Sequence, residues 1–143
     1  MANTFKYVRG QETLQALPIG SGVVVEIGTH LKLSGGLVTP VAAATDNLAY
    51  IGVAKEAHRA VEGAGKITVA LPNAEAIYRV PLDAASTWVV GDLFQLNSTQ
   101  KLAKNTTDAV AVAVNAGTSA TEVEVMYLLP NTTGGLRFVG DAS

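Results

Sequence analysis

Cysteine is absent from the 143-residue chain, which excludes disulfide frameworks, thiol catalysis and cysteine-based zinc sites. Charged residues make up only 15% of the sequence and the formal net charge is -2, so no general basic face for nucleic acid is indicated. No run approaches the roughly 20 apolar residues of a membrane-spanning helix, and the first residues lack the apolar core of a signal peptide. We therefore expect a soluble protein that binds neither nucleic acid nor membrane and folds without metal or disulfide.

Hydrophobic residues make up 48% of the sequence, so Thr, Ser, Asn, Gly and Ala must cover much of its surface. Such a surface suits a protein that packs against other proteins, although a β-rich domain with little charge has the same composition. A closed homo-oligomer is the assembly that we expect.

Period-two alternation of apolar and polar residues over 66–71, 109–114 and 122–127 is typical of half-buried strands. Ser34-Gly35-Gly36 between two leucines predicts a tight hairpin, since glycine adopts positive φ without a Cβ penalty. Pro81 is expected to end a short strand over residues 77–80. Residues 55–62 fit either a short helix or an edge strand. Many short strands separated by turn residues predict an all-β fold, a small barrel or sandwich.

The strand pattern is used twice. Downstream, residues 89–96 lead through a polar turn to 101–103, then to 109–114 and 122–130. Upstream, residues 22–27 lead to a hairpin over 31–38, then to 49–54 and 66–72. This order predicts an internal repeat, with few identities between the copies.

We expect an N-terminal arm over residues 1–18, a β domain over 19–130 and a C-terminal tail over 131–143. Apolar residues in an arm need a partner surface, so the candidates for contact with another subunit or a partner protein are Phe5, Tyr7, Leu14 and Leu17. An edge strand folded back on its own domain is the alternative for this segment.

Trp88 is a further contact candidate. With Tyr78, Phe94 and Tyr127 it could also form a stacking platform for nucleic acid or sugar, but few cations alternate with these rings. A core or subunit-interface cluster is therefore favoured.

Catalytic patterns are weak. His58 with Glu56 and Glu62 lacks the second histidine of a zinc helix and is expected on a solvated polar face, and His30 is expected at the surface or an interface. Gly63-Ala64-Gly65-Lys66 opens a strand rather than the helix of a phosphate-binding loop. Asp83, Asp92 and Asp108 flank turns, where aspartate commonly caps its own backbone. We expect no enzyme activity, no cofactor and no metal.

The order of these segments resembles a known family. Gly91-Asp92-Leu93-Phe94, the hairpin, the Ala-Val-Ala-Val run and the final Val-x-Val-x-x-Leu-Leu are similar to the capsid decoration, or cement, proteins of tailed bacteriophages. The runs at 50–54, 65–69 and 76–81 look like the same pattern, so the resemblance covers about residues 19–130.

The resemblance implies a β-tulip or barrel-like domain, usually a homotrimer, that sits on the outer surface of the head. There it would clamp neighbouring major capsid subunits. A tail, baseplate or other virion adaptor is the alternative, and a small β-barrel ligand-binding module or enzyme is a further one.

Overall fold

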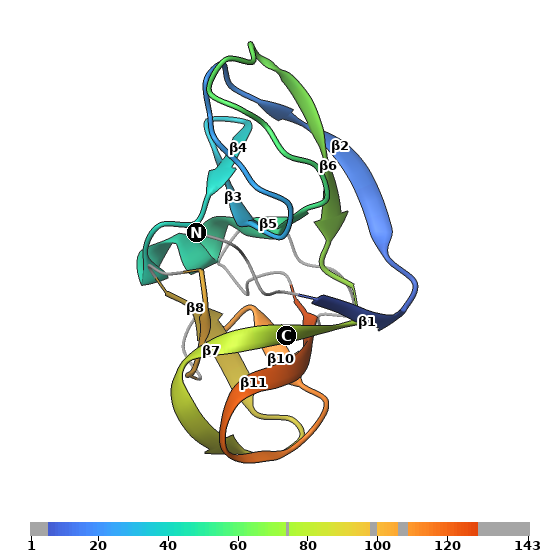
Figure 1. The fold of residues 1–143 in the computed structure, drawn as a ribbon, viewed down its shortest axis with the longest axis vertical. Coiled ribbons are helices and arrows are strands. Elements are labelled where there is room, and N and C mark those ends of the chain that lie inside the picture. Colours follow the sequence, from blue (N-terminus) through green and yellow to red (C-terminus); the bar gives the residue numbers. More distant parts are fainter. Residues whose placement is uncertain (1–5, 74, 98–99, 106–108, 129–143) are drawn as a thin grey trace, which may run out of the picture.

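The computed structural model describes residues 6–73, 75–97, 100–105 and 109–128, and these residues are mostly in β-strands (Figure 1). The described elements are, in chain order, β1 (Lys6–Gly10), β2 (Thr13–Ile19), β3 (His30–Ser34), β4 (Leu37–Pro40), the 3-10 helix η1 (Ala44–Ala49), β5 (Tyr50–Ala54), β6 (Gly65–Leu71), β7 (Ala76–Trp88), β8 (Leu93–Leu96), β9 (Leu102–Lys104), β10 (Ala111–Ala113) and β11 (Gly117–Tyr127). The predicted all-β fold is confirmed.

Two small barrels make up the molecule. Strands β2 to β6 close in the order β2-β4-β3-β5-β6 and form the first barrel. The other strands form a six-stranded sheet, β1-β7-β11-β10-β8-β9, and an additional pairing of β7 with β9 closes β7 to β11 as the second barrel. Figure 1 shows the first barrel at the top of the view and the second at the bottom, with β1 beside β7.

The two barrels have the same topology. In each, the first of five strands lies between the third and the fifth, and the second lies between the third and the fourth. The first and third strands of each barrel are parallel, and they pair at Ile19 with Val38 in the first barrel and at Leu82 with Leu102 in the second. All other neighbouring strands of the barrels are antiparallel. The predicted internal repeat is thus confirmed as a repeat of topology.

One part of the predicted repeat alignment is wrong. The structural counterpart of β8 is β3, whereas residues 22–27, the predicted counterpart of residues 89–96, form no strand. They contain a single isolated bridge, between Val25 and His58. The apolar run over 22–25 resembles a strand in composition, but it lies before the repeat's second strand and forms a loop.

A glycine turn precedes the second strand of each barrel. Gly28 and Gly91 have φ angles of +90° and +98° at the third position of their turns, which is typical of a type II turn. The counterpart bonds are Thr29 N–H to Glu26 O (3.1 Å) and Asp92 N–H to Val89 O (3.1 Å), with side-chain bonds from Glu26 N–H to Thr29 Oγ1 (3.2 Å) and from Val89 N–H to Asp92 Oδ2 (3.0 Å). The expected capping role of Asp92 is confirmed, and this bond helps to hold its pKa below the usual range.

The predicted hairpin joins β3 to β4. Ser34 pairs with Leu37, and the two glycines between them have φ angles of +61° and +82°. Positive φ at both central positions is the geometry of a type I′ turn, which matches the twist of the flanking strands.

Residues 6–18 are not an arm. β1 pairs with β7, and β2 pairs with β6 over its full length, from Thr13 opposite Leu71 to Ile19 opposite Gly65. Without them β6 and β7 would present unpaired backbone groups, and Leu17 would no longer pack against the first barrel's core. The alternative held open for this segment, an edge strand folded back on its own domain, describes β1. The predicted C-terminal tail, residues 131–143, lies outside the described residues.

Two further expectations change. Residues 55–62 form neither a helix nor a continuous strand, but bends and a turn around one bridge. β7 continues through Pro81 for 13 residues. Proline is tolerated there because β1 pairs only as far as Arg79, β9 joins only at Leu82, and the β11 register shifts next to the proline's partner, Glu122.

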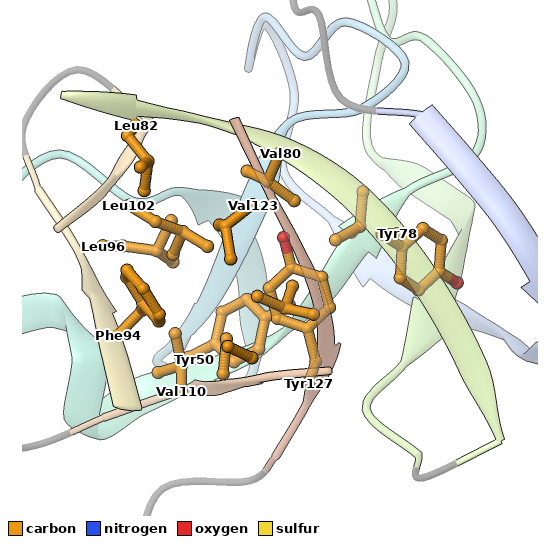
Figure 2. Packing of buried hydrophobic residues seen from close by; sticks show 14 of the residues in the cluster. Tyr50, Tyr78, Val80, Leu82, Phe94, Leu96, Leu102, Val110, Val123 and Tyr127 are labelled. Carbon is orange, nitrogen blue, oxygen red and sulfur yellow. The ribbon is translucent and has the colours of Figure 1, made fainter. Parts of the chain in front are cut away.

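Two apolar clusters form the core. One fills the first barrel and includes Ile19, Leu31 and Val69. The other fills the second barrel and continues into the first through Val41, Tyr50 and Val53. Figure 2 shows this continuation, with Tyr50 beside Tyr127 and their ring centroids 5.6 Å apart. The barrels are therefore packed against each other rather than merely linked.

Candidate interaction surface

Tyr7 lies on β1, the edge strand of the six-stranded sheet, and is 46% exposed. Its ring packs edge-on against Tyr78 with centroids 5.8 Å apart, and its hydroxyl donates a hydrogen bond to the carbonyl of Gly10. The Lys55 ammonium lies 6.0 Å from the ring centroid. Tyr7 is thus held on its own sheet, with nearly half of its surface left for a partner.

Leu14 and Leu17 lie on β2 with different surroundings. Leu14 is 52% exposed, whereas Leu17 packs against the core of the first barrel. Phe5 lies outside the described residues. Among the predicted contact residues of this segment, Tyr7 and Leu14 are therefore the ones with open surface.

Trp88 is buried. It is 2% exposed, its ring meets that of Phe94 at 87° with centroids 6.0 Å apart, and its indole N–H donates to the carbonyl of Asn115 at 3.0 Å. Gly117 lies so close that an added Cβ would be 2.5 Å from the indole ring. Trp88 is a core residue of the second barrel and offers no surface to a partner in this structure.

His58 is not on a solvated face, because it is only 5% exposed. Its Nδ1 lies 2.6 Å from the carbonyl oxygen of Val23 and its Nε2 lies 3.0 Å from that of Gly63. Carbonyl oxygens only accept, so both ring nitrogens donate when the ring is protonated. These two bonds raise the pKa of His58 above its usual value. His58 joins two loops of the first barrel.

His30 is also buried, at 1% exposure, and it lies where the two barrels meet. Its Nε2 is 2.6 Å from the Tyr127 hydroxyl, while its backbone N–H and Nδ1 lie 2.6 and 3.1 Å from Oε1 of Gln100. Since Oε1 accepts from the backbone N–H, we assign the ring proton to Nδ1, and Nε2 then accepts from Tyr127. Burial lowers the pKa of His30 to about 4. The histidine is therefore neutral and structural at neutral pH.

Gln100 and Asn47 complete this contact between the barrels. The Gln100 side-chain NH₂ donates to the carbonyls of His30 (3.1 Å) and Val41 (2.7 Å). Asn47, in η1, donates to the Leu96 carbonyl and accepts from the Leu96 N–H, both at 2.8 Å. Sequence reasoning missed both amides, because a single glutamine or asparagine in a turn has no pattern that distinguishes it.

Glu12 links the barrels on another side. Its carboxylate accepts from the Tyr78 hydroxyl of β7 at 2.5 Å and from the Lys55 ammonium after β5 at 3.1 Å. Burial and the neighbouring carboxylate raise the pKa of Tyr78. Glu12 therefore fixes the β1–β2 connection against both barrels.

Tyr50 contrasts with its neighbours. Its hydroxyl is the one buried side-chain polar atom without a hydrogen-bond partner in the described part of the chain. Its ring still packs against His30 and Tyr127, with centroids 6.1 and 5.6 Å away. Tyr50 thus contributes its ring to the junction but not its hydroxyl.

The described residues hold no group of three or more His, Cys, Asp or Glu side chains placed to bind a metal ion. The same residues include no helix long and apolar enough to cross a membrane. What the surface does offer is uncharged area: Val24, Ile27, Val61, Val89 and Val90 are each more than half exposed.

No protein-family model matches the chain, and no curated protein matches it in sequence. Among the solved structures that are similar in fold is one with a TM-score of 0.53 at 13% identity, over 85% of this chain and 99% of the other. That structure is the N base of the head fiber protein gp8.5 of bacteriophage phi29. At this identity the likeness shows a shared fold over nearly the whole of both chains.

Proposed function

We propose that this protein is a structural component of a bacteriophage head, bound on the outer surface of the capsid as a decoration protein. There it stabilises contacts between major capsid subunits and carries out no chemistry. The observation that carries the proposal is the shared fold with the phi29 head fiber base, which extends over almost all of both chains. The order of motifs that resembles decoration proteins is independent support.

The assembly that we propose is a homotrimer. The exposed Ile27, Val89 and Val90 leave uncharged area that a monomer would expose to water. Three copies that bind together link three weak contacts, which raises apparent affinity by about 10²-fold or more. Small contacts with several capsid subunits then suffice.

A second candidate is a base that anchors a fibre on the head, and the description of the similar structure as a head fiber base favours it. Both candidates predict binding to heads. Only the decoration role predicts that the heads themselves become more stable.

The test uses heads that lack this protein. The purified protein should co-sediment with them, raise the temperature at which they release DNA, and do so at low and high salt alike, because apolar contacts are screened little. Light scattering of the free protein should give the mass of a trimer. Binding without a rise in the release temperature would favour the fibre base, and absence of binding would refute the head assignment.

A further inference from the structure

The β2 strand has a free edge. It pairs with β6 along residues 13–19, but on its other side only Ile19 is joined to a neighbour, Val38 of β4. The described backbone makes no hydrogen bond outside the sheets to residues 13–18, and Thr13, Leu14, Gln15 and Ala16 are all exposed. Every second residue along this edge therefore presents an unpaired N–H and C=O to solvent.

Natural proteins protect such edges, and β1 shows how. It carries Lys6 and Arg9, and a bulge interrupts its register between Tyr7 and Arg9. Charged side chains and bulges are the usual means of preventing an edge from pairing with another chain. The free edge of β1 is therefore unsuited to accept a strand.

The free edge of β2 has none of this protection over most of its length. Residues 13–19 contain no charge, and their register with β6 runs without a shift. Pro18 near the end of the strand is the one blocking residue. Leu14 and Ala16 share a face of the strand, so an added strand would cover an exposed apolar side chain beside a small one. The edge fits an extended, uncharged polypeptide segment.

A second copy of this chain does not fit as that segment. Two identical β2 edges pair antiparallel only about a twofold axis, which the proposed trimer lacks. β1, the edge strand of the six-stranded sheet, is guarded by its charges and bulge. A segment from another protein meets neither of these obstacles.

We propose that the β2 edge accepts an extended, uncharged segment of the capsid subunit, which adds as a strand beside β2. This inference rests on the proposed function. Backbone hydrogen bonds to the edge supply affinity, and Leu14 supplies the apolar contact. The absence of charge makes this contact insensitive to salt.

The test places a block on the edge without disturbing the β2–β6 pairing. A proline has no N–H to donate to β6, so Pro18 indicates that the even-numbered residues of β2 direct their N–H groups to the free side. Ala16→Pro therefore removes a hydrogen-bond donor from the free side only. Ala16→Lys adds the charge that natural edges carry. Val61→Lys is the matched control, since Val61 is 89% exposed and lies in a turn outside the strands.

Melting temperature and solution mass are measured first and should match the wild type for all three variants. Affinity for heads lacking the protein should fall at least about tenfold for both Ala16 variants and by less than about twofold for Val61→Lys. In the wild type, amide exchange at Leu14 and Ala16 should slow on binding to heads.

The outcomes separate this inference from the proposed function. If the wild type binds heads and both Ala16 variants bind equally well, the edge is not the docking surface, although the head assignment stands. If the Ala16 variants change the solution mass of the free protein, the edge joins copies of this chain and the inference is wrong. If the wild type does not bind heads, the proposed function itself fails.

Discussion

Removing the hydroxyl of Tyr127 should destabilise the protein, whereas removing that of Tyr50 should not. Both rings are almost fully buried, 5.6 Å apart, so Tyr→Phe preserves volume at both sites. The Tyr127 hydroxyl donates to His30 at 2.6 Å across the junction, while the Tyr50 hydroxyl has no partner among the described residues. The two substitutions therefore differ in the hydrogen bond to His30.

The expected magnitudes follow from that bond. Loss of the donor to a buried acceptor costs about 1 to 3 kcal/mol, and removal of an unpaired buried hydroxyl is neutral or mildly stabilising. With an unfolding entropy of about 2.1 cal/mol/K per residue, the melting temperature should fall by roughly 3 to 10 °C for Tyr127→Phe. For Tyr50→Phe it should stay the same or rise.

Thermal and urea unfolding, followed by far-UV circular dichroism, measure both variants beside the wild type. Equal stability of the two variants would show that the bond to His30 contributes nothing. A loss confined to Tyr50→Phe would reverse the assignment of which hydroxyl is paired.

Three further predictions concern pH and packing. The pKa of His30 is about 4 in the folded protein and 6.5 in the unfolded chain, so the folded protein binds this proton more weakly. The contribution of neutral His30 to the free energy of unfolding is therefore complete above about pH 6.5 and is lost as pH falls through 4. The loss amounts to at most about 3 kcal/mol. The pKa of His58 is raised in the folded protein, so its contribution to the free energy of unfolding is present at low pH and is lost as pH rises. In urea unfolding across pH, the variant His58→Ala should lack this loss of stability at higher pH and keep the loss at low pH. Gly117→Ala should lower the free energy of unfolding by about 1 to 3 kcal/mol and alter Trp88 fluorescence, because the new Cβ would meet the indole at 2.5 Å. Gly65→Ala is the control: no atom lies within 4 Å of its added Cβ, so the free energy of unfolding should change by less than about 0.5 kcal/mol. Unchanged fluorescence and stability in Gly117→Ala would contradict the close packing of Gly117 against Trp88.

The fold class and the repeat could be predicted because both depend on local patterns. Alternation at 66–71 and 122–127 identifies strands, and Gly35-Gly36 identifies a hairpin, without knowledge of the rest of the chain. The placement of residues 6–19 could not be predicted, since it depends on which distant strands have unpaired edges. For the same reason the burial of His30 was missed, because its partner Gln100 is 70 residues away in sequence.

The candidate surface was predicted only in part. An exposed and a buried aromatic residue look alike in sequence, so Tyr7 and Trp88 received the same assignment although one is 46% and the other 2% exposed. Asn47 and Glu12 make their contacts across the barrel junction, and their neighbours in the chain contain no sign of it.

The two barrels meet through a turn that only one of them can supply. Gln100 lies in the turn that follows β8, the second strand of the second barrel. Its side chain binds the backbone at His30, where β3, the second strand of the first barrel, begins. The two barrels, which share one topology, therefore meet through opposite ends of their second strands. The contact thus joins two different surfaces of the same fold, as a heterologous interface does. The corresponding turn of the first barrel is Gly35-Gly36, which has no side chain to donate. The duplicated fold is therefore asymmetric at its contact, because the second barrel carries Gln100 and the first carries no counterpart of it.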